Sequence, residues 1–271
     1  MKATAGFDRA PLDSELDGGE GRRLKLENRL TLGLEVDRGF DLGSGREALV
    51  GFGVRRETYP AVSEGNRLFF DARLAYHHDL PGDRRQLRFN LDATTALDPS
   101  DEVFSRLRIG GTYRMGVAPR QMFWTRLRYS YRDQNEENTF SGYDQSEWLG
   151  EFNYAWQSSD WNWYVLATLY QEQRYADRDR YSYTENGIRM LARYRLNPET
   201  RIALRASGFA RDYVGGGRED RRLRSTLGFE KSLNDAVTLE AYAGYVHNHS
   251  NDIQKAFSGA LIGVMLNYTF P

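Results

Sequence analysis

Hydrophobic and polar residues alternate with a period of two along most of the chain. In residues 24–36, LKLENRLTLGLEV, leucine and valine occupy one parity and charged residues, threonine and glycine occupy the other, with Asn28 as the interruption. The same alternation recurs in residues 87–97, 106–115 and 223–229. Because successive side chains of a β-strand point to opposite faces, this pattern predicts strands with one apolar and one polar face.

The connections between these predicted strands alternate between short and long. The short ones have the Gly, Pro, Asn and Asp residues of tight hairpin turns: LPGD (80–83), GVAPR (116–120), SSDW (158–161), NPET (197–200) and LNDA (233–236). The longer ones are polar and cover residues 59–66, 97–102, 132–145, 174–180, 214–220 and 247–255. This order predicts an antiparallel meander whose two ends face different surroundings.

The number of strands predicts a closed barrel. Residues 24–270 contain about 13 alternating segments, and single-chain transmembrane barrels have an even number of strands. The N-terminal KATAGFD also alternates, through Ala3, Ala5 and Phe7, and is followed by the polar APLDSELDGGEG, which we expect to be an outer loop. We therefore predict an all-β fold, a closed antiparallel up-and-down barrel of about 14 strands, which forms a single domain over residues 1–271.

The size of this barrel indicates which face meets water. Roughly eight strands already enclose a core that side chains fill, so 14 strands with leucine and valine inside would leave unfilled space. We therefore expect the apolar parity to face lipid and the polar parity to face a lumen. The charged fraction of 28% and mean hydropathy of −0.69 do not exclude this, since such a barrel exposes only every second strand residue to lipid. No apolar run approaches the roughly 20 residues of a transmembrane helix.

Aromatic residues gather at the predicted strand ends, where a membrane protein meets the lipid–water boundary. The sequence favours a role at this interface for Trp156, Trp161, Trp163, Tyr268 and Phe270, and Trp124 and Tyr183 occupy similar positions beside turns and loops. The alternative is the ordinary enrichment of aromatic residues in β proteins.

The last predicted strand, AFSGALIGVMLNYTF, alternates and ends near an aromatic residue, Phe270, which Pro271 follows. In this the chain resembles Gram-negative outer-membrane β-barrel proteins. Its length and strand number are similar to those of monomeric porins and of the barrel domains of polysaccharide-export proteins and surface lipoprotein assembly modifiers. The resemblance implies an outer-membrane location, a monomer, short periplasmic turns, longer extracellular loops, and the bilayer, lipopolysaccharide and the barrel-assembly machinery as partners. The N-terminus has no apolar signal core, so we expect a signal peptide to have been removed.

The polar parity predicts a strongly cationic lumen. The residues that we expect to line the pore are Arg29, Arg55, Arg73, Arg88, Arg106, Arg108, Arg114, Arg126, Arg128, Arg189, Arg193, Arg205, Arg222 and Arg224, with Glu27, Asp92, Glu151, Glu230 and Glu240 among them. Cations outnumber carboxylates in this set, so the lumen should favour anions. The near-neutral net charge of −1 then requires acidic loops, and NEEN, SELDGGEG and DPSDE meet that need. The alternative is that arginines and carboxylates pair into a ladder that fills the lumen.

The sequence gives little support to an enzymatic function. In VHNHSN, His249 directly precedes Ser250 and points to the opposite face of a strand, so it is not placed to act as a base, and Asn248 stands where an outer-membrane lipid hydrolase would have its histidine. His247 and His249 share a face but have no third ligand in the sequence pattern. We expect no catalytic residue, no metal or other cofactor, and no nucleic-acid partner.

Three functions remain open. The first is a passive outer-membrane channel that passes small anionic solutes or exports an anionic polysaccharide. The second is a plugged barrel that acts as a translocon or assembly factor for surface lipoproteins. The third and most remote is a lipid hydrolase at Ser250.

Overall fold

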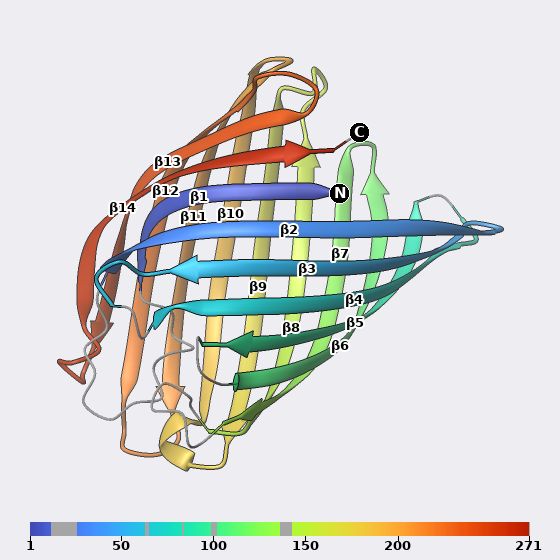
Figure 1. Cartoon of the computed structure of the whole chain (residues 1–271). Coiled ribbons are helices and arrows are strands. Elements are labelled where there is room, and N and C mark those ends of the chain that lie inside the picture. Colours follow the sequence, from blue (N-terminus) through green and yellow to red (C-terminus); the bar gives the residue numbers. More distant parts are fainter. Residues whose placement is uncertain (12–25, 63–64, 83, 99–101, 136–142, 271) are drawn as a thin grey trace.

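Fourteen antiparallel strands form one closed sheet in the computed structural model (Figure 1). The structure describes all residues except 12–25, 63–64, 83, 99–101, 136–142 and 271. The strands are β1 (Lys2–Pro11), β2 (Leu26–Gly43), β3 (Arg46–Thr58), β4 (Arg67–Leu80), β5 (Arg85–Leu97), β6 (Glu102–Ala118), β7 (Gln121–Gln134), β8 (Gln145–Gln157), β9 (Trp163–Ala176), β10 (Tyr183–Asn197), β11 (Thr200–Tyr213), β12 (Glu219–Ser232), β13 (Val237–Ser250) and β14 (Phe257–Thr269). A short 3-10 helix, η3 (Asp179–Tyr181), precedes β10. The predicted fold class is confirmed.

The first and last strands close the barrel, as the sequence predicts. Ala5 of β1 lies opposite Leu32 of β2 on one side and Leu266 of β14 on the other. Closure removes the unpaired backbone edges that an open sheet would expose. Each remaining strand pairs with its sequence neighbours, so the meander has no crossover.

The two ends of the barrel differ in their connections. The short turns and both chain termini lie at one end, and the longer connections lie at the other (Figure 1). One tight turn escapes the sequence analysis: it joins β2 to β3 through Gly43, Ser44 and Gly45, all with positive φ. Two strands also extend further than predicted, since β1 reaches Pro11 and β13 runs through Ser250. The acidic loops predicted in SELDGGEG, NEEN and DPSDE fall largely outside the described residues.

The polarity of the barrel is inverted relative to a water-soluble protein. Leucine and phenylalanine side chains of the outer face are exposed, as at Leu32 (60%) and Phe52 (64%), whereas the inward-facing Glu57 is 3% exposed. A continuous exposed apolar band of this kind is stable only against an apolar medium. Among the described residues, no helix is long and apolar enough to span a membrane.

Inward-facing side chains are packed differently along the barrel axis. Towards the loop end they are buried by one another, as at Phe69, Phe104, Tyr183 and Leu261. In the middle of the barrel, inward-facing arginines such as Arg205 stay exposed. Inward-facing arginines are therefore exposed in the middle of the barrel, whereas inward-facing side chains towards the loops cover one another.

Candidate functional site in the barrel lumen

Strand register places every residue of the predicted pore lining on the inward-facing parity. For example, Arg106 lies opposite Thr94 and Arg132, and Arg205 opposite Leu191 and Thr226, with the intervening residues on the outer face. The same parity rule covers the others: Arg29, Arg55, Arg73, Arg88, Arg108, Arg114, Arg126, Arg128, Arg189, Arg193, Arg222, Arg224, Glu27, Asp92, Glu151, Glu230 and Glu240. What separates these residues is their partners.

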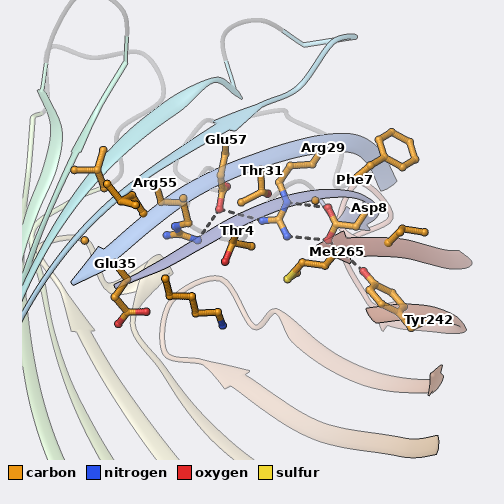
Figure 2. Close-up of a pocket in the computed structure, with 17 residues that line it drawn as sticks. Thr4, Phe7, Asp8, Arg29, Thr31, Glu35, Arg55, Glu57, Tyr242 and Met265 are labelled. Atoms are coloured by element: carbon orange, nitrogen blue, oxygen red, sulfur yellow. Dashed lines mark hydrogen bonds and ion pairs between the residues drawn. The ribbon is translucent and has the colours of Figure 1, made fainter. Parts of the chain in front are cut away.

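We call the inner faces of β1 to β5 the seam wall, because they adjoin the closure between β1 and β14. Figure 2 shows its central ion pairs, in which Arg29 reaches both Asp8 and Glu57. Its Nε and Nη2 donate to the two carboxylate oxygens of Asp8 at 3.0 and 2.9 Å, and its Nη1 lies 3.3 Å from Glu57. Arg55 donates to the same Glu57 at 2.7 Å. Asp8 and Glu57 thus neutralise Arg29 and Arg55.

The seam wall is also tied across the closure by neutral donors. Tyr242 of β13 extends over Gly263 of β14, and its hydroxyl donates to Asp8 of β1 at 3.2 Å (Figure 2). A side chain at Gly263 would collide with this ring, which explains the glycine there. Closer to the turn end, Thr4 donates to Asn267 at 3.0 Å, and Asn267 donates to Glu240 at 2.9 Å.

We call the inner faces of β6 to β12 the arginine wall. It contains a recess of about 510 Å³ in which Arg126 and Arg189 both bind Glu151, at 3.3 and 2.5 Å. Glu151 is buried, whereas both arginines are more than 40% exposed. Two further arginines line the recess, Arg205 and Arg224, and neither has an ion-pair partner among the described residues.

The arginine wall continues from this recess towards the turn end. An adjoining recess of about 520 Å³ shares Leu166 and Leu191 with the first and is lined by Arg193, Arg195 and Arg201. Of these three, Arg201 is paired with Glu230. Guanidinium groups therefore follow one another along the wall from the middle of the barrel to its open end, with fewer carboxylates than cations beside them.

Towards the loop end, Arg174 and Arg211 of this wall are largely covered and paired with carboxylates. The ring of Tyr183 lies between two guanidinium groups, with the Arg174 and Arg211 Cζ atoms 4.6 and 4.1 Å from its centroid. Arg174 donates to Glu147 at 2.9 Å, and Arg211 donates to Glu185 at 2.8 Å. We call these five residues the loop-end belt. Guanidinium groups stacked on an aromatic ring and bound to carboxylates hold one another in place.

The structure corrects the placement that the sequence favours for Tyr183, Arg174 and Trp124. Tyr183 was expected at the lipid interface, but it faces the lumen and is 2% exposed. Arg174 was assigned to a loop, although Tyr170, Glu172 and Arg174 continue the inward parity of β9 and that alternation was available in the sequence. Trp124 likewise lines the luminal recess and does not face lipid.

The remaining interface aromatics point outward or lie at the turn end. Trp156, Trp161, Trp163 and Tyr268 are exposed, all close to short turns or the C-terminus. Phe270 follows β14 and packs edge-on against Tyr268, with ring centroids 4.6 Å apart. Their position at the level of a lipid headgroup layer stays a prediction.

The described residues contain no cluster of three metal-ligating side chains. Ser250 and Asn248 face the lumen, while His249 faces outward on β13. Asn248 accepts from Arg222 at 3.0 Å and donates to the backbone of Lys255. The geometry therefore assigns Asn248 to the packing of the loop end.

No protein-family model and no curated protein matches the sequence. Solved structures match it along nearly its whole length. The outer-membrane channel DcaP of Acinetobacter baumannii is 13% identical, with 99% of this chain and 96% of DcaP covered and a TM-score of 0.56. A bacterial polysaccharide outer-membrane secretin is 14% identical, with coverages of 100% and 98% and a TM-score of 0.55. The anion-selective porin of Comamonas acidovorans is 12% identical, with coverages of 99% and 97% and a TM-score of 0.50.

These likenesses show the fold. The chain is a closed 14-strand β-barrel of the kind found in Gram-negative outer-membrane channels.

Proposed function

We propose that this protein is a passive channel of the Gram-negative outer membrane and that its lumen favours anions. The observation that carries the proposal is the pair Arg205 and Arg224, exposed in a luminal recess with no carboxylate bound to them. An unpaired guanidinium is tolerated inside a protein only where water or an anion reaches it. A surplus of such groups along a pore raises the local concentration of anions and lowers that of cations.

Two kinds of cargo agree with this wall. Small anionic solutes need only the electrostatic attraction, and an anionic polysaccharide would use the run of arginines from Arg205 through Arg193 to Arg201 as successive contacts. Among the similar structures are an anion-selective porin and a polysaccharide secretin, which supports both cargoes equally.

The loop-end belt supports a second candidate, a plugged barrel that serves as a translocon or assembly factor for surface lipoproteins. The buried Tyr183, with the guanidinium groups of Arg174 and Arg211 stacked on it, would narrow the lumen where a solute enters from outside. In that case the loops, and not the lumen, would carry the partner site.

Recording in planar bilayers under a KCl gradient separates the candidates. The channel hypothesis predicts an open conductance whose reversal potential lies closer to the chloride equilibrium potential than to that of potassium. In the double variant Arg205→Glu/Arg224→Glu, the preference for chloride over potassium should fall several-fold. The control is Arg221→Glu, which reverses one arginine charge on the outer face of β12, as each single substitution does in the lumen, and should leave the reversal potential unchanged. A folded barrel without conductance would reject the channel and favour the plugged barrel.

A further inference from the structure

A row of apolar side chains crosses the arginine wall and ends at a cation. Four inward-facing residues from four neighbouring strands, β7 to β10, lie opposite one another: Met122, Ala155, Leu166 and Leu191. Leu191 in turn lies opposite Arg205 of β11, which has no ion-pair partner among the described residues. Because neighbouring strands are about 4.8 Å apart, the four apolar residues span about 14 Å across the wall. We call them the apolar row.

Two leucines of the apolar row line both luminal recesses. Leu166 and Leu191 stand where the recess of about 510 Å³ adjoins the one of about 520 Å³, and Trp124 also lines the first of these. Apolar surface that faces an aqueous lumen lacks the favourable free energy of burial. A ligand with an apolar body would bury this surface, and ligand sites commonly combine such surface with a few polar groups.

Guanidinium groups surround Leu191 on three sides. Arg189 and Arg193 are two residues away on β10 and share its face, so their Cα atoms lie about 6.7 Å from that of Leu191. Arg205 lies directly opposite on β11, and the fourth side is Leu166. A ligand that rests on the two leucines therefore has a cation within reach in three directions.

The one carboxylate in the larger recess does not oppose an anion there. Glu151 is buried, and both Arg126 and Arg189 are bound to it. By contrast, Arg193 and Arg205 have no carboxylate partner in the part of the chain that the structure describes. The charge available to a ligand beside the leucines is therefore positive.

We propose that this part of the arginine wall binds organic anions in which a carboxylate, sulfonate or phosphate group is attached to an apolar body. The body lies on Leu166 and Leu191, and the anionic group contacts Arg205. The proposal rests on the proposed function, because it requires that solutes enter the lumen, and it narrows the class of solute. Guanidinium groups attract every anion, whereas the apolar row favours those with an apolar body over inorganic ions of the same charge.

Three fluorinated probes test the proposal on the unmodified chain. The first, para-(trifluoromethyl)benzenesulfonate, has both the charge and an apolar ring. Trifluoromethanesulfonate has the charge without the ring, and para-(trifluoromethyl)benzenesulfonamide has the ring without the charge. Each probe is titrated with the detergent-solubilised full chain, and binding is measured by fluorine NMR relaxation against protein-free micelles. We expect the ring sulfonate to bind at least tenfold more tightly than either of the others. Equal affinity of the ring sulfonate and either other probe would overturn the proposal.

Variants locate the site. Leu166→Asn/Leu191→Asn should bring the affinities of the two sulfonates within twofold of each other. The matched control is Leu49→Asn, which changes another inward-facing leucine, on β3 of the seam wall, and should keep the tenfold preference. Arg205→Gln should weaken the ring sulfonate at least fivefold and leave the sulfonamide unchanged. A preference for the ring that persists in the double leucine variant would contradict the assignment to the apolar row.

The comparison of the three probes needs no variant, so it stands even if the double leucine variant does not fold. NMR relaxation measures binding and does not depend on conductance, so the two hypotheses can fail separately. A barrel that conducts chloride but binds both sulfonates equally would reject the apolar site alone. A barrel that prefers the ring sulfonate but carries no current would support the site and reject the channel alone.

Discussion

The seam wall and the arginine wall line the same lumen with the same residue types, yet they treat charge in opposite ways. On the seam wall, Arg29 contacts two carboxylates and Asp8 also accepts from Tyr242. On the arginine wall, Arg126 and Arg189 share the single Glu151, while Arg205 and Arg224 have no carboxylate partner among the described residues. The first arrangement binds strands to one another, and the second leaves guanidinium groups without a carboxylate. Under the proposed function, partner number and not residue type separates a structural arginine from one that attracts a solute.

The largest effect expected on stability comes from the same substitution made on each wall. Arg29→Gln leaves Asp8 without its cation and the buried Glu57 with Arg55 alone, and removing one partner of such a network costs about 3 kcal/mol. Arg205→Gln removes no ion pair and should stay within about 0.5 kcal/mol of the wild type. Urea titration in lipid vesicles, with the folded fraction read from heat-modifiable gel mobility, measures both. Equal losses would erase the distinction between the walls.

A smaller effect is expected from the hydroxyl that crosses the seam. Tyr242→Phe keeps the ring over Gly263 but removes the bond to Asp8, which should cost about 1 kcal/mol in the same titration. Tyr245→Phe is the matched control, because that tyrosine lies on the outer face of β13 and is 53% exposed. If the control loses as much stability as Tyr242→Phe, the Tyr242 hydroxyl does not stabilise the barrel through its bond to Asp8.

Alternation along the chain was sufficient to predict the strands, their faces and the closure of the barrel. Lipid outside and water inside impose a strict parity, which is why KATAGFD is identified correctly as β1 despite its small side chains. Parity says nothing about the register between strands. Arg29 and Arg205 therefore look alike in sequence, and only the structure shows that Arg29 binds Asp8 while Arg205 is exposed with no carboxylate partner among the described residues.

The packing of the loop end escaped the sequence for a related reason. Tyr183 stands beside a connection, where an interface aromatic is equally plausible, and its place between Arg174 and Arg211 depends on three strands meeting. The β2–β3 turn is a separate case, since its GSG sequence has the glycines of a hairpin and was a local signal available at residues 43–45.

The smallest effect concerns a carboxylate outside the lumen, in the β8–β9 turn of the arginine wall. The Ser158 hydroxyl, and next the backbone N–H of Asn162 at 3.1 Å, hold the pKa of Asp160 below its usual value. The stabilisation is therefore present above the unfolded-state pKa, about 3.9, and is lost as the pH falls through the lower folded-state pKa. Asp160→Asn should be slightly less stable than the wild type near neutral pH, with the difference shrinking in acid. A constant difference across pH would contradict this origin, and ion selectivity should not change.

The account depends most on one claim, that neighbouring residues of a strand face different media. The chain has no cysteine, so single substitutions can be labelled cleanly. Arg205→Cys and Leu204→Cys, reconstituted in lipid vesicles, are exposed to a membrane-impermeant sulfonate thiol reagent, and the modified fraction is read by mass spectrometry. We predict rapid modification at residue 205 and protection at residue 204, which is 52% exposed in the absence of lipid. Protection at 205 with reaction at 204 would contradict the inverted polarity and the channel proposed from it.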